Sequence, residues 1–400
     1  MKKIFLSFML FAVMLAPVVL TSCGDDDPEN GDDRELVHKL AEEGVLLGKL
    51  KDKLELKAGT EYALTGSFIV EENGELHIPA GTVIKANEGF GNYILMLQGG
   101  KIFVNGTAQA PVTMTANKAN AAQGHWGGLI INGRAPLAGG TTGTTEINTD
   151  YKYGGTNVAD NSGSITYLKL EYTGARSNAD VEHNGLTLNG VGNGTTIENI
   201  LIPNGADDGI EFFGGSVNVK NLLVVNSDDD MFDFTQGYNG TLENAYGIWE
   251  AGYVSSEEDP RGVEADGNLD GNSPNQTGQS DFTIRNMTID LRLAANTAEG
   301  YYMHDVIKVR RGAKATIENA LVKGTGIAKD LIDFGDGKGF GDPTSSISLT
   351  NSLTNPITGA ERNEISGNVN RTGEFTNAGK IEPGNTGCPT NIFSWTGYQF

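Results

Sequence analysis

The chain has 400 residues, 55 of them glycine, and a formal net charge of −22. This glycine content, together with the lack of sustained helical periodicity after residue 60, favours short strands joined by tight turns over a helical fold. The negative charge excludes nucleic acid as a partner, because phosphates and carboxylates repel one another. It favours the binding of divalent cations instead.

The N-terminus reads as an export signal. Lys2 and Lys3 precede an apolar run over residues 4–20, and residues 20–23 read LTSC. A transmembrane anchor is the alternative, but the run is short for a hydrocarbon core about 30 Å thick. Residues 20–23 resemble the lipobox of bacterial lipoproteins. That resemblance implies removal of a signal peptide, residues 1–22, and a lipid on Cys23 that anchors the protein to the outer membrane.

Residues 23–33 are acidic and contain no large apolar side chain, which predicts a flexible tether. The tract also resembles the acidic signals that carry some Gram-negative lipoproteins to the cell surface. Residues 34–60 are predicted to be an N-terminal cap or lead-in. Residues 32–50 are expected to form an amphipathic helix with Leu36, Leu40 and Leu47 near one face, covering the open edge of the strands that follow.

Strands are predicted from residue 61 onward. Residues 74–78 and 100–104 alternate apolar with polar positions, as half-buried strands do. Residues 94–97 and 129–131 are unbroken apolar runs, typical of strands buried on both faces. Residues 138–163 are rich in Gly, Thr, Asn and Asp, which predicts a long loop that leaves the stacked strands.

A repeat runs through the second half of the chain. Asn199 and Asn221 match at an offset of 22, and Glu211 and Asp233 match at the same offset. A fixed short period of small apolar segments is typical of a solenoid. Asn tolerates a left-handed backbone, so an Asn at each turn is expected to form a structural ladder. The predicted ladder contains Asn199, Asn221, Asn244, Asn286, Asn319 and Asn351, with Tyr167 at the same place in the earliest copy.

The period, the Asn turn and the apolar-x-apolar strands resemble the right-handed parallel β-helix of the pectate-lyase-like superfamily. Residues 124–131 and 207–215 also resemble secreted or lipid-anchored bacterial β-helix proteins. The resemblance implies an all-β fold: one right-handed parallel β-helix solenoid over residues 61–400 with a short N-terminal cap. It constrains function weakly, because the superfamily includes lyases, hydrolases and adhesins.

The strands after the Asn turns predict a column of outward-facing residues. Their apolar neighbours point into the core, so the middle residue of each strand points out, and successive turns stack roughly 4.8 Å apart. A second acidic row precedes this column at Asp207, Asp208, Asp229, Asp230, Asp305 and Asp330. The column itself contains Thr187, Glu211, Asp233, Glu264, Lys308 and Asp333.

Clustered carboxylate oxygens suit a hard cation, and Ca²⁺ is the cation we expect. An acidic face in contact with solvent, without an ion, is the alternative. The predicted ligands are Glu211, Asp233, Glu264, Asp208 and Asp230.

Two insertions, one between Asn244 and Glu264 and one between Asn286 and Lys308, carry aromatic and basic residues toward this column. Aromatic side chains on loops over a charged groove suit the faces of sugar rings, whereas the alternative is that they cover exposed core. The predicted ligand-binding residues are Trp249, Tyr253, Arg261, Tyr301, Tyr302 and His304.

We expect a surface-anchored β-helix that binds extracellular polysaccharide or another surface ligand with Ca²⁺. A Ca²⁺-dependent lyase acting on an acidic polysaccharide is the first alternative. In lyases of the superfamily, an Arg or Lys acts as the base that takes a proton from the sugar. By resemblance, that base would here be Lys308 or Arg310. A glycoside hydrolase is less favoured, because no Gly-His-Gly or Arg-x-Lys is present. A structural adhesin without a small-ligand site is the second alternative. Cys388 is expected to be incidental, and nothing indicates an oligomeric state.

Overall fold

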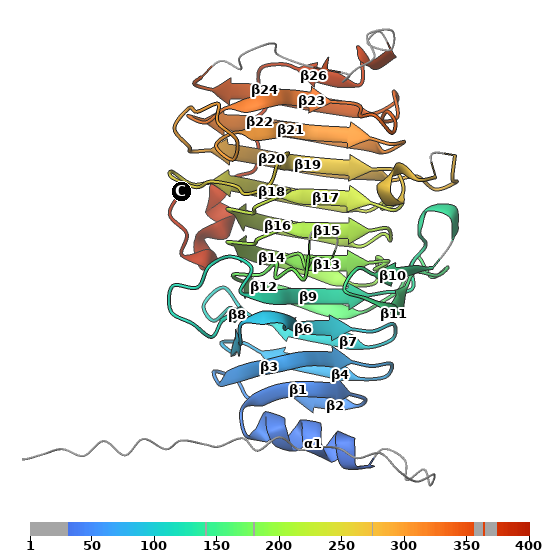
Figure 1. The fold of residues 1–400 in the computed structure, drawn as a ribbon, viewed down its shortest axis with the longest axis vertical. Helices are drawn as coiled ribbons and strands as arrows, with labels where there is room; N and C mark the ends of the chain where they lie inside the picture. Colours follow the sequence, from blue (N-terminus) through green and yellow to red (C-terminus); the bar gives the residue numbers. More distant parts are fainter. Residues whose placement is uncertain (1–30, 141, 179–180, 274, 356–362, 365–373) are drawn as a thin grey trace, which may run out of the picture.

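The computed structural model describes residues 31–140, 142–178, 181–273, 275–355, 363–364 and 374–400. The predicted signal peptide, Cys23 and most of the acidic tether lie outside these ranges. The predicted fold is confirmed: 24 strands pair in one sheet that coils around the long axis as a right-handed parallel β-helix (Figure 1). In the ranges described, no helix has the length and apolar character that crossing a membrane requires.

The N-terminal half of the coil carries one helix, a short 3-10 turn and the first thirteen strands of the numbering. These are α1 (Gly31–Glu42), β1 (Val45–Leu50), β2 (Lys53–Glu55), β3 (Glu61–Val70), β4 (Glu75–Pro79), β5 (Val83–Ala86), β6 (Gly89–Met96), β7 (Lys101–Asn105), β8 (Val112–Ala116), β9 (Trp126–Asn132), η1 (Ala138–Gly140), β10 (Gly143–Thr145), β11 (Asn148–Tyr153), β12 (Gly163–Leu170) and β13 (Leu186–Asn189).

The C-terminal half continues with longer strands and two 3-10 turns. These are β14 (Thr196–Pro203), β15 (Ile210–Phe213), β16 (Asn218–Val225), β17 (Phe232–Thr235), β18 (Thr241–Trp249), β19 (Arg261–Asp266), η2 (Leu269–Gly271), β20 (Asp281–Leu291), β21 (Met303–Arg310), β22 (Lys314–Gly324), β23 (Ala328–Asp333), β24 (Ser346–Leu353), β25 (Asn363–Glu364), β26 (Gly379–Ile381) and η4 (Thr390–Thr396).

From β9 onward, each turn of the coil contains one short strand and one long, bent strand. The short strands β9, β13, β15, β17, β19, β21 and β23 pair in parallel and form one face. The long strands β12, β14, β16, β18, β20 and β22 also pair in parallel. Because β12 pairs with both β7 and β8, its two halves continue two separate faces of the earlier turns.

The Asn ladder is confirmed over five positions. Asn221 has φ of 59°, and its side-chain amide donates to Asn199 Oδ1 at 2.9 Å. Asn244, Asn286 and Asn319 repeat this contact, each with the preceding Asn. Tyr167 takes the same left-handed backbone, with φ of 52°.

The ladder prediction is wrong for Asn351. It pairs with Val322, three residues after Asn319, and the register between β22 and β24 also shifts by one residue after Ile317. The shift removes one residue at the bend, so no side chain there continues the amide contacts of Asn319.

The N-terminal helix differs from the predicted one. It ends at Glu42, and residues 45–50 form β1, which pairs with β3. Its buried residues are Val37 and Ala41, whereas Leu36 is 50% exposed. The predicted apolar face is therefore wrong, and the coil begins inside the range expected to be only a lead-in. The helix still caps the first turn, as predicted (Figure 1).

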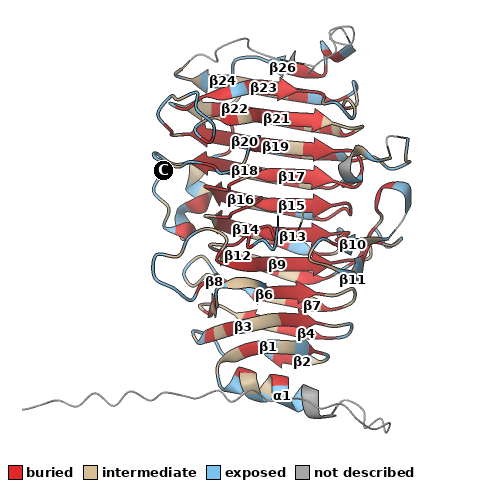
Figure 2. Ribbon diagram, in the orientation of Figure 1, coloured by how far each residue is buried: buried red, intermediate tan, exposed pale blue. Residues whose placement is uncertain are grey.

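Most residues of the stacked strands are buried (Figure 2), and their inward side chains form one hydrophobic core. Phe212 and Phe234 lie parallel with ring centres 5.0 Å apart, and Phe234 and Phe282 follow at 4.2 Å. Equivalent positions on successive turns coincide, so like residues meet like residues and the column continues. Phe212 and Phe234 directly follow Glu211 and Asp233 in their strands, so their inward direction makes these acids point outward.

Two segments leave the coil. The predicted loop at 138–163 does so and contains the antiparallel hairpin of β10 and β11. The last residues also leave the coil, because η4 lies against the outer surface of β16 (Figure 1). The β-helix was predicted to continue to residue 400, whereas η4 is not part of the coil. Phe393 is fully buried there in an apolar cluster with Tyr246 and Cys388. Burial raises the pKa of the Cys388 thiol to about 12, so it is no nucleophile.

Candidate functional site

The predicted outward column is confirmed in its register. Glu211 pairs with Asp233, Asp233 with Glu264, and Glu264 with Lys308. Their apolar neighbours are in the core, with Ile210 and Phe212 fully buried. The strand alternation seen in the sequence therefore places these charged groups on one outer face of the coil.

This face is covered rather than open. Glu211 and Asp233 are each only 8% exposed, which argues against a fully solvated acidic surface. The turn between β10 and β11 brings Glu146 over the strands, and the segment before β13 brings Glu182. Together they bound an acidic cavity of about 340 Å³, lined by Glu146, Glu182, Asn184, Asp207, Asp208, Glu211, Asp229, Asp230, Asp233 and Glu264.

Backbone contacts hold the second acidic row in place. The Asp230 N–H donates to Asp208 Oδ1 at 2.9 Å, and the Arg261 N–H donates to Asp230 Oδ1 at 2.8 Å. Each carboxylate is thus fixed by the backbone of the next turn. The contact repeats along the coil and keeps the carboxylates of neighbouring turns close together.

Two groups of carboxylates inside the acidic cavity have the spacing that a metal ion needs. In each group the candidate ligand oxygens lie within 4.8 Å of one another. Three of the predicted ligands, Asp208, Glu211 and Asp233, form one group. The other consists of Asp207, Asp208 and Asp229, of which the sequence identified Asp207 and Asp229 as acidic but not as ligands.

The acidic cavity contains buried carboxylate oxygens that have no hydrogen-bond partner, among them Oδ1 of Asp229 and Oδ1 of Asp233. Asp233 is the more deeply buried of these two residues, with 8% of its surface exposed. An unpaired buried carboxylate oxygen costs free energy, because burial removes its water without replacing it. The residues present therefore suit a hard cation, which would bind such an oxygen directly.

Burial and mutual repulsion raise the pKa values of these carboxyls. Burial, reinforced by Glu146 and Asp233, raises the pKa of Glu211 well above its usual value. Burial and Glu264 act in the same way on the pKa of Asp233. Burial and Glu264 also raise the pKa of Asp229 to about 7. Ionising this group without a cation is therefore costly.

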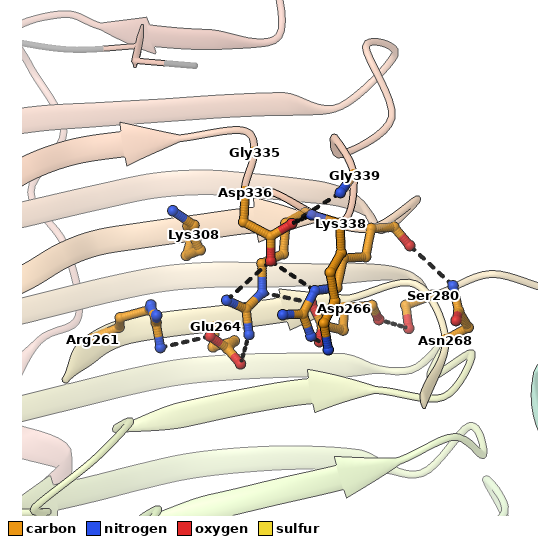
Figure 3. Close-up of polar contacts among 12 residues, drawn as sticks. Arg261, Glu264, Asp266, Asn268, Ser280, Lys308, Gly335, Asp336, Lys338 and Gly339 are labelled. Atoms are coloured by element: carbon orange, nitrogen blue, oxygen red, sulfur yellow. Dashed lines mark hydrogen bonds and ion pairs between the residues drawn. The ribbon is translucent and has the colours of Figure 1, made fainter. Parts of the chain in front are cut away.

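At the β19 side of the acidic cavity, arginines neutralise the acids. Arg261 Nη1 lies 2.6 Å from Glu264, and Arg310 Nη2 lies 2.5 Å from the other oxygen of Glu264 (Figure 3). Arg310 and Arg311 also contact Asp266. Glu264 is consequently a poor metal ligand, contrary to the prediction.

Asp230 is also less suited to metal binding than predicted. One oxygen accepts the Arg261 N–H, and the other lies 3.6 Å from the Arg261 guanidinium. Both of its oxygens already face a donor or a positive charge.

The two predicted bases are already paired. Lys308 Nζ contacts Asp333 and lies 3.7 Å from Asp305. Burial opposes the charge of Arg310, but Glu264 and Asp266 outweigh it and raise the pKa of that guanidinium. Neither group is poised to accept a proton, so the geometry does not favour the lyase role predicted for them.

The aromatic residues predicted to bind ligand do not line the acidic cavity. Trp249 is fully buried and donates through Nε1 to Ser227 O, so in this structure it has no exposed surface for the predicted ligand contact. Tyr253 packs against the core and donates to Asp228. These two residues cover core, as the alternative interpretation expected, because their insertion folds back onto the coil.

The second insertion also falls outside the acidic cavity. Tyr301 is 39% exposed, and the hydroxyl of Tyr302 contacts Glu299. His304 lies between Asp305 and Lys329, at 3.1 and 2.9 Å. Of the six predicted residues, Arg261 alone contacts residues that line the acidic cavity.

The chain was compared with protein families, curated proteins and solved structures. A family model described as "Pectate-lyase like beta helix domain" matches residues 48–398. The chain belongs to this pectate-lyase-like β-helix family. Membership indicates a carbohydrate-related role. No curated protein and no solved structure matches the chain.

This pectate-lyase-like β-helix has a second cavity that the sequence did not predict. It measures about 460 Å³ and lies between the hairpin loop and residues 269–276. Tyr153 and Phe213 supply apolar rings, and Tyr153 donates to Gln236 Oε1 at 2.7 Å. Glu146 lines both cavities, so they adjoin. The sequence marked this loop as an excursion, but where it folds depends on tertiary contacts.

Proposed function

We propose that this β-helix binds a divalent cation, with Ca²⁺ as the chief candidate, in the acidic cavity and uses it to hold an extracellular carbohydrate. The observation that carries the proposal is the buried, unpartnered Oδ1 of Asp233, which lies among carboxylates of the neighbouring turns. The predicted lipid on Cys23 would hold the protein at the outer membrane, where such ligands occur.

The chemistry of the lining supports a cation more than a bare acidic ligand site. Ca²⁺ takes six to eight oxygen ligands at about 2.3–2.6 Å. Asp208, Glu211 and Asp233 supply part of that number. Water or ligand hydroxyls would fill the remainder. The adjoining cavity of about 460 Å³ is lined by both apolar and polar side chains, as ligand-binding cavities are.

Calcium binding is tested by thermal unfolding of the folded chain in EDTA and in millimolar CaCl₂. A ligand that binds only the folded state stabilises it by about 2.7 kcal/mol at a hundredfold excess over Kd. We expect Ca²⁺ to raise the unfolding temperature of the wild type and to have little effect on Asp233→Asn. The control is Asp281→Asn, an exposed carboxylate paired with Lys314. An identical transition with EDTA and Ca²⁺ would rule out the cation.

Carbohydrate binding is tested on a panel of neutral and acidic polysaccharides, with Ca²⁺ and with EDTA. Retention that needs Ca²⁺ supports the proposal. Binding of no polysaccharide, with Ca²⁺ bound, would leave a cation-stabilised structural adhesin. Unsaturated-uronate absorbance in the same samples detects lyase activity. We expect none, because Lys308 and Arg310 are held in ion pairs.

A further inference from the structure

A row of charged residues runs along the outer face formed by the first halves of the long strands. β14, β16, β18, β20 and β22 lie on successive turns and pair in parallel (Figure 1). In each of these strands the residue directly before the ladder Asn is charged, and the register places it beside its equivalent on the next turn. We call this row the charge ladder; it consists of Glu198, Lys220, Glu243, Arg285 and Glu318.

The sign of the charge alternates at every step of the charge ladder. Each acid is followed by a base on the next turn, and each base by an acid. Lys220 Nζ lies 3.5 Å from Glu243, and Arg285 Nε lies 3.1 Å from Glu318. With three carboxylates and two cationic groups, the charge ladder has a formal charge of −1, whereas the whole chain has −22. The row is thus a nearly neutral strip on a strongly acidic molecule.

The charge ladder is open to solvent, unlike the other outer faces of the same turns. Glu146 and Glu182 lie over the short-strand face, and η4 lies over the second halves of the long strands. The side chain of Lys220 is 46% exposed and that of Arg285 is 52% exposed. A shallow depression of about 400 Å³ lies between the strands here, and its lining includes Thr196, Glu198, Asn218, Lys220, Glu243 and Arg285.

An alternating row of charges is complementary to a second copy of itself. A two-fold axis along the strand direction, passing between the turns of Lys220 and Glu243, makes the two coils antiparallel. Lys220 then faces Glu243 of the partner subunit, and Glu198 faces Arg285 of the partner subunit. A two-fold axis along the coil would instead place each residue against its own copy, so like charges would meet. The alternation therefore favours the antiparallel pair.

The size of the face limits the strength of such a pair. Six strands, from β12 to β22, are spaced about 4.8 Å apart and contribute about four residues of roughly 3.3 Å each, which gives roughly 400 Å² per copy. Interfaces that bury less than about 1,200 Å² in total are typical of weak, transient complexes. Repulsion between two acidic chains also opposes association, but salt at about 0.15 M screens charges more than about 8 Å apart and affects contacting pairs less.

We propose that the charge ladder is a self-association surface through which two copies of this chain pair with their coils antiparallel. The inference is independent of the proposed cation and carbohydrate site, which lies on the short-strand face. The association is weak and reversible, and it depends on salt because oppositely charged side chains carry it.

Sedimentation velocity of the wild-type chain tests the inference without any variant. The chain is measured at concentrations up to about 300 μM, in EDTA so that no bound cation contributes. We expect a monomer–dimer equilibrium at about 0.15 M NaCl and a Kd at least tenfold higher at about 1 M, where the screening length falls to about 3 Å. A chain that stays monomeric at every concentration, or a dimer equally stable at both salt concentrations, would overturn the inference.

Reversal of one charge tests whether the charge ladder is the surface involved. Lys220→Glu leaves no cation between Glu198 and Glu243, and we expect it to raise the Kd of the dimer at least tenfold. The matched control is Lys85→Glu on β5, which reverses an exposed lysine paired with Glu61 and changes the net charge equally. It should leave the Kd within about twofold, since β5 is not part of the charge ladder. Equal losses in both variants would assign the effect to net charge and contradict the inference.

Two charge-reversed chains test the pairing through a gain of association. One carries Lys220→Glu and Arg285→Glu, and the other carries Glu198→Lys, Glu243→Lys and Glu318→Lys. Each charge ladder then has a single sign, so we expect each chain alone to be monomeric and an equimolar mixture to form a heterodimer. A mixture that stays monomeric, although both chains have the circular dichroism of the wild type, would contradict pairing through the charge ladder.

Discussion

At the scale of single residues, two neighbouring parts of the same outer face bury carboxylates. One is the acidic cavity around Asp233, and the other is Glu264 with Arg261 and Arg310. Around Glu264 the chain supplies guanidinium groups, whereas around Asp233 it supplies none at hydrogen-bond distance among the described residues. The difference marks Asp233 and its neighbours as the part of the face where we propose that a cation binds.

Removing one charge from the acidic cavity should stabilise the metal-free chain. We expect Asp233→Asn to increase the free energy of unfolding in EDTA by about 1–2 kcal/mol, because the substitution relieves repulsion and burial of charge. Chemical denaturation measures the change, with Asp281→Asn as the exposed control. A loss of stability in EDTA would mean that Asp233 is already compensated within the fold.

Lys308 should behave in the opposite way. Lys308→Met leaves Asp333 without its buried cation, whereas Asp305 keeps Arg261, and breaking a buried pair costs about 3–5 kcal/mol. The matched control is Lys314→Met, which removes a partly exposed pair with Asp281 worth about 0–1 kcal/mol. Denaturant unfolding compares the two. Equal losses would show that burial of the Lys308 pair has no energetic weight.

At the scale of elements, the bent strands depend on the Asn ladder. Each ladder Asn both adopts a left-handed backbone and passes a hydrogen bond to the next turn. A residue with a branched or longer side chain cannot do both. The ladder therefore fixes the corner between two faces and, through it, the register of the acidic column.

Substitutions at Asn221 can separate these two contributions. Asn221→Ala is expected to cost about 2–3 kcal/mol, from backbone strain together with the lost side-chain contacts. Asn221→Gly should cost less, because glycine accepts the left-handed backbone. Asn351→Ala, outside the ladder and exposed, should change stability by less than about 0.5 kcal/mol. Equal effects at Asn221 and Asn351 would deny the ladder any special role.

The C-terminal segment stabilises the outer surface of the long strands. Phe393 fills a cluster formed with Tyr246 and Ile248. Phe393→Ala is expected to cost about 3–4 kcal/mol, as for other large-to-small changes in a core. Ile381→Ala, 39% exposed, should cost under about 1 kcal/mol. Thermal unfolding compares them, and an unchanged Phe393 variant would mean that the segment packs only loosely.

At the scale of the whole molecule, the buried carboxyls make stability depend on pH. A carboxyl whose pKa is raised in the folded state binds more protons there than in the unfolded chain. Its stabilising effect is present at low pH and is lost as pH rises from about 4 through the folded pKa, about 7 for Asp229. Burial lowers the pKa of His183 to about 4, so its contribution is lost in the other direction, as pH falls from about 6.5 to 4.

The His183 contribution is complete about one pH unit above its unfolded pKa of 6.5, so the carboxyl effect dominates at higher pH. In EDTA we expect the unfolding temperature to fall by several degrees between pH 6.5 and 8.5, because the carboxyls lose their protons. Saturating Ca²⁺ should abolish or reverse the fall, since the cation prefers ionised ligands. Calorimetry measures both. A metal-free transition that does not move with pH would contradict the raised pKa values.

The sequence alone determined the coil, the Asn corners and the order of the acidic column. These depend on local rules repeated turn after turn: strand alternation, and an Asn where the backbone turns left-handed. Asn351 shows the limit, because one missing residue at the bend shifts the register without disturbing the local pattern.

Only the tertiary structure decided which column residues are paired and which are not. Glu264 and Asp233 occupy the same place in their strands, yet Arg261 of the same strand and Arg310 of the next turn pair with Glu264, whereas no arginine of the described residues pairs with Asp233. An insertion's composition likewise does not reveal whether its side chains fold onto the core, as Trp249 does, or over the acids. Long-range contacts between turns set charge compensation and loop direction, and neither is encoded within one repeat.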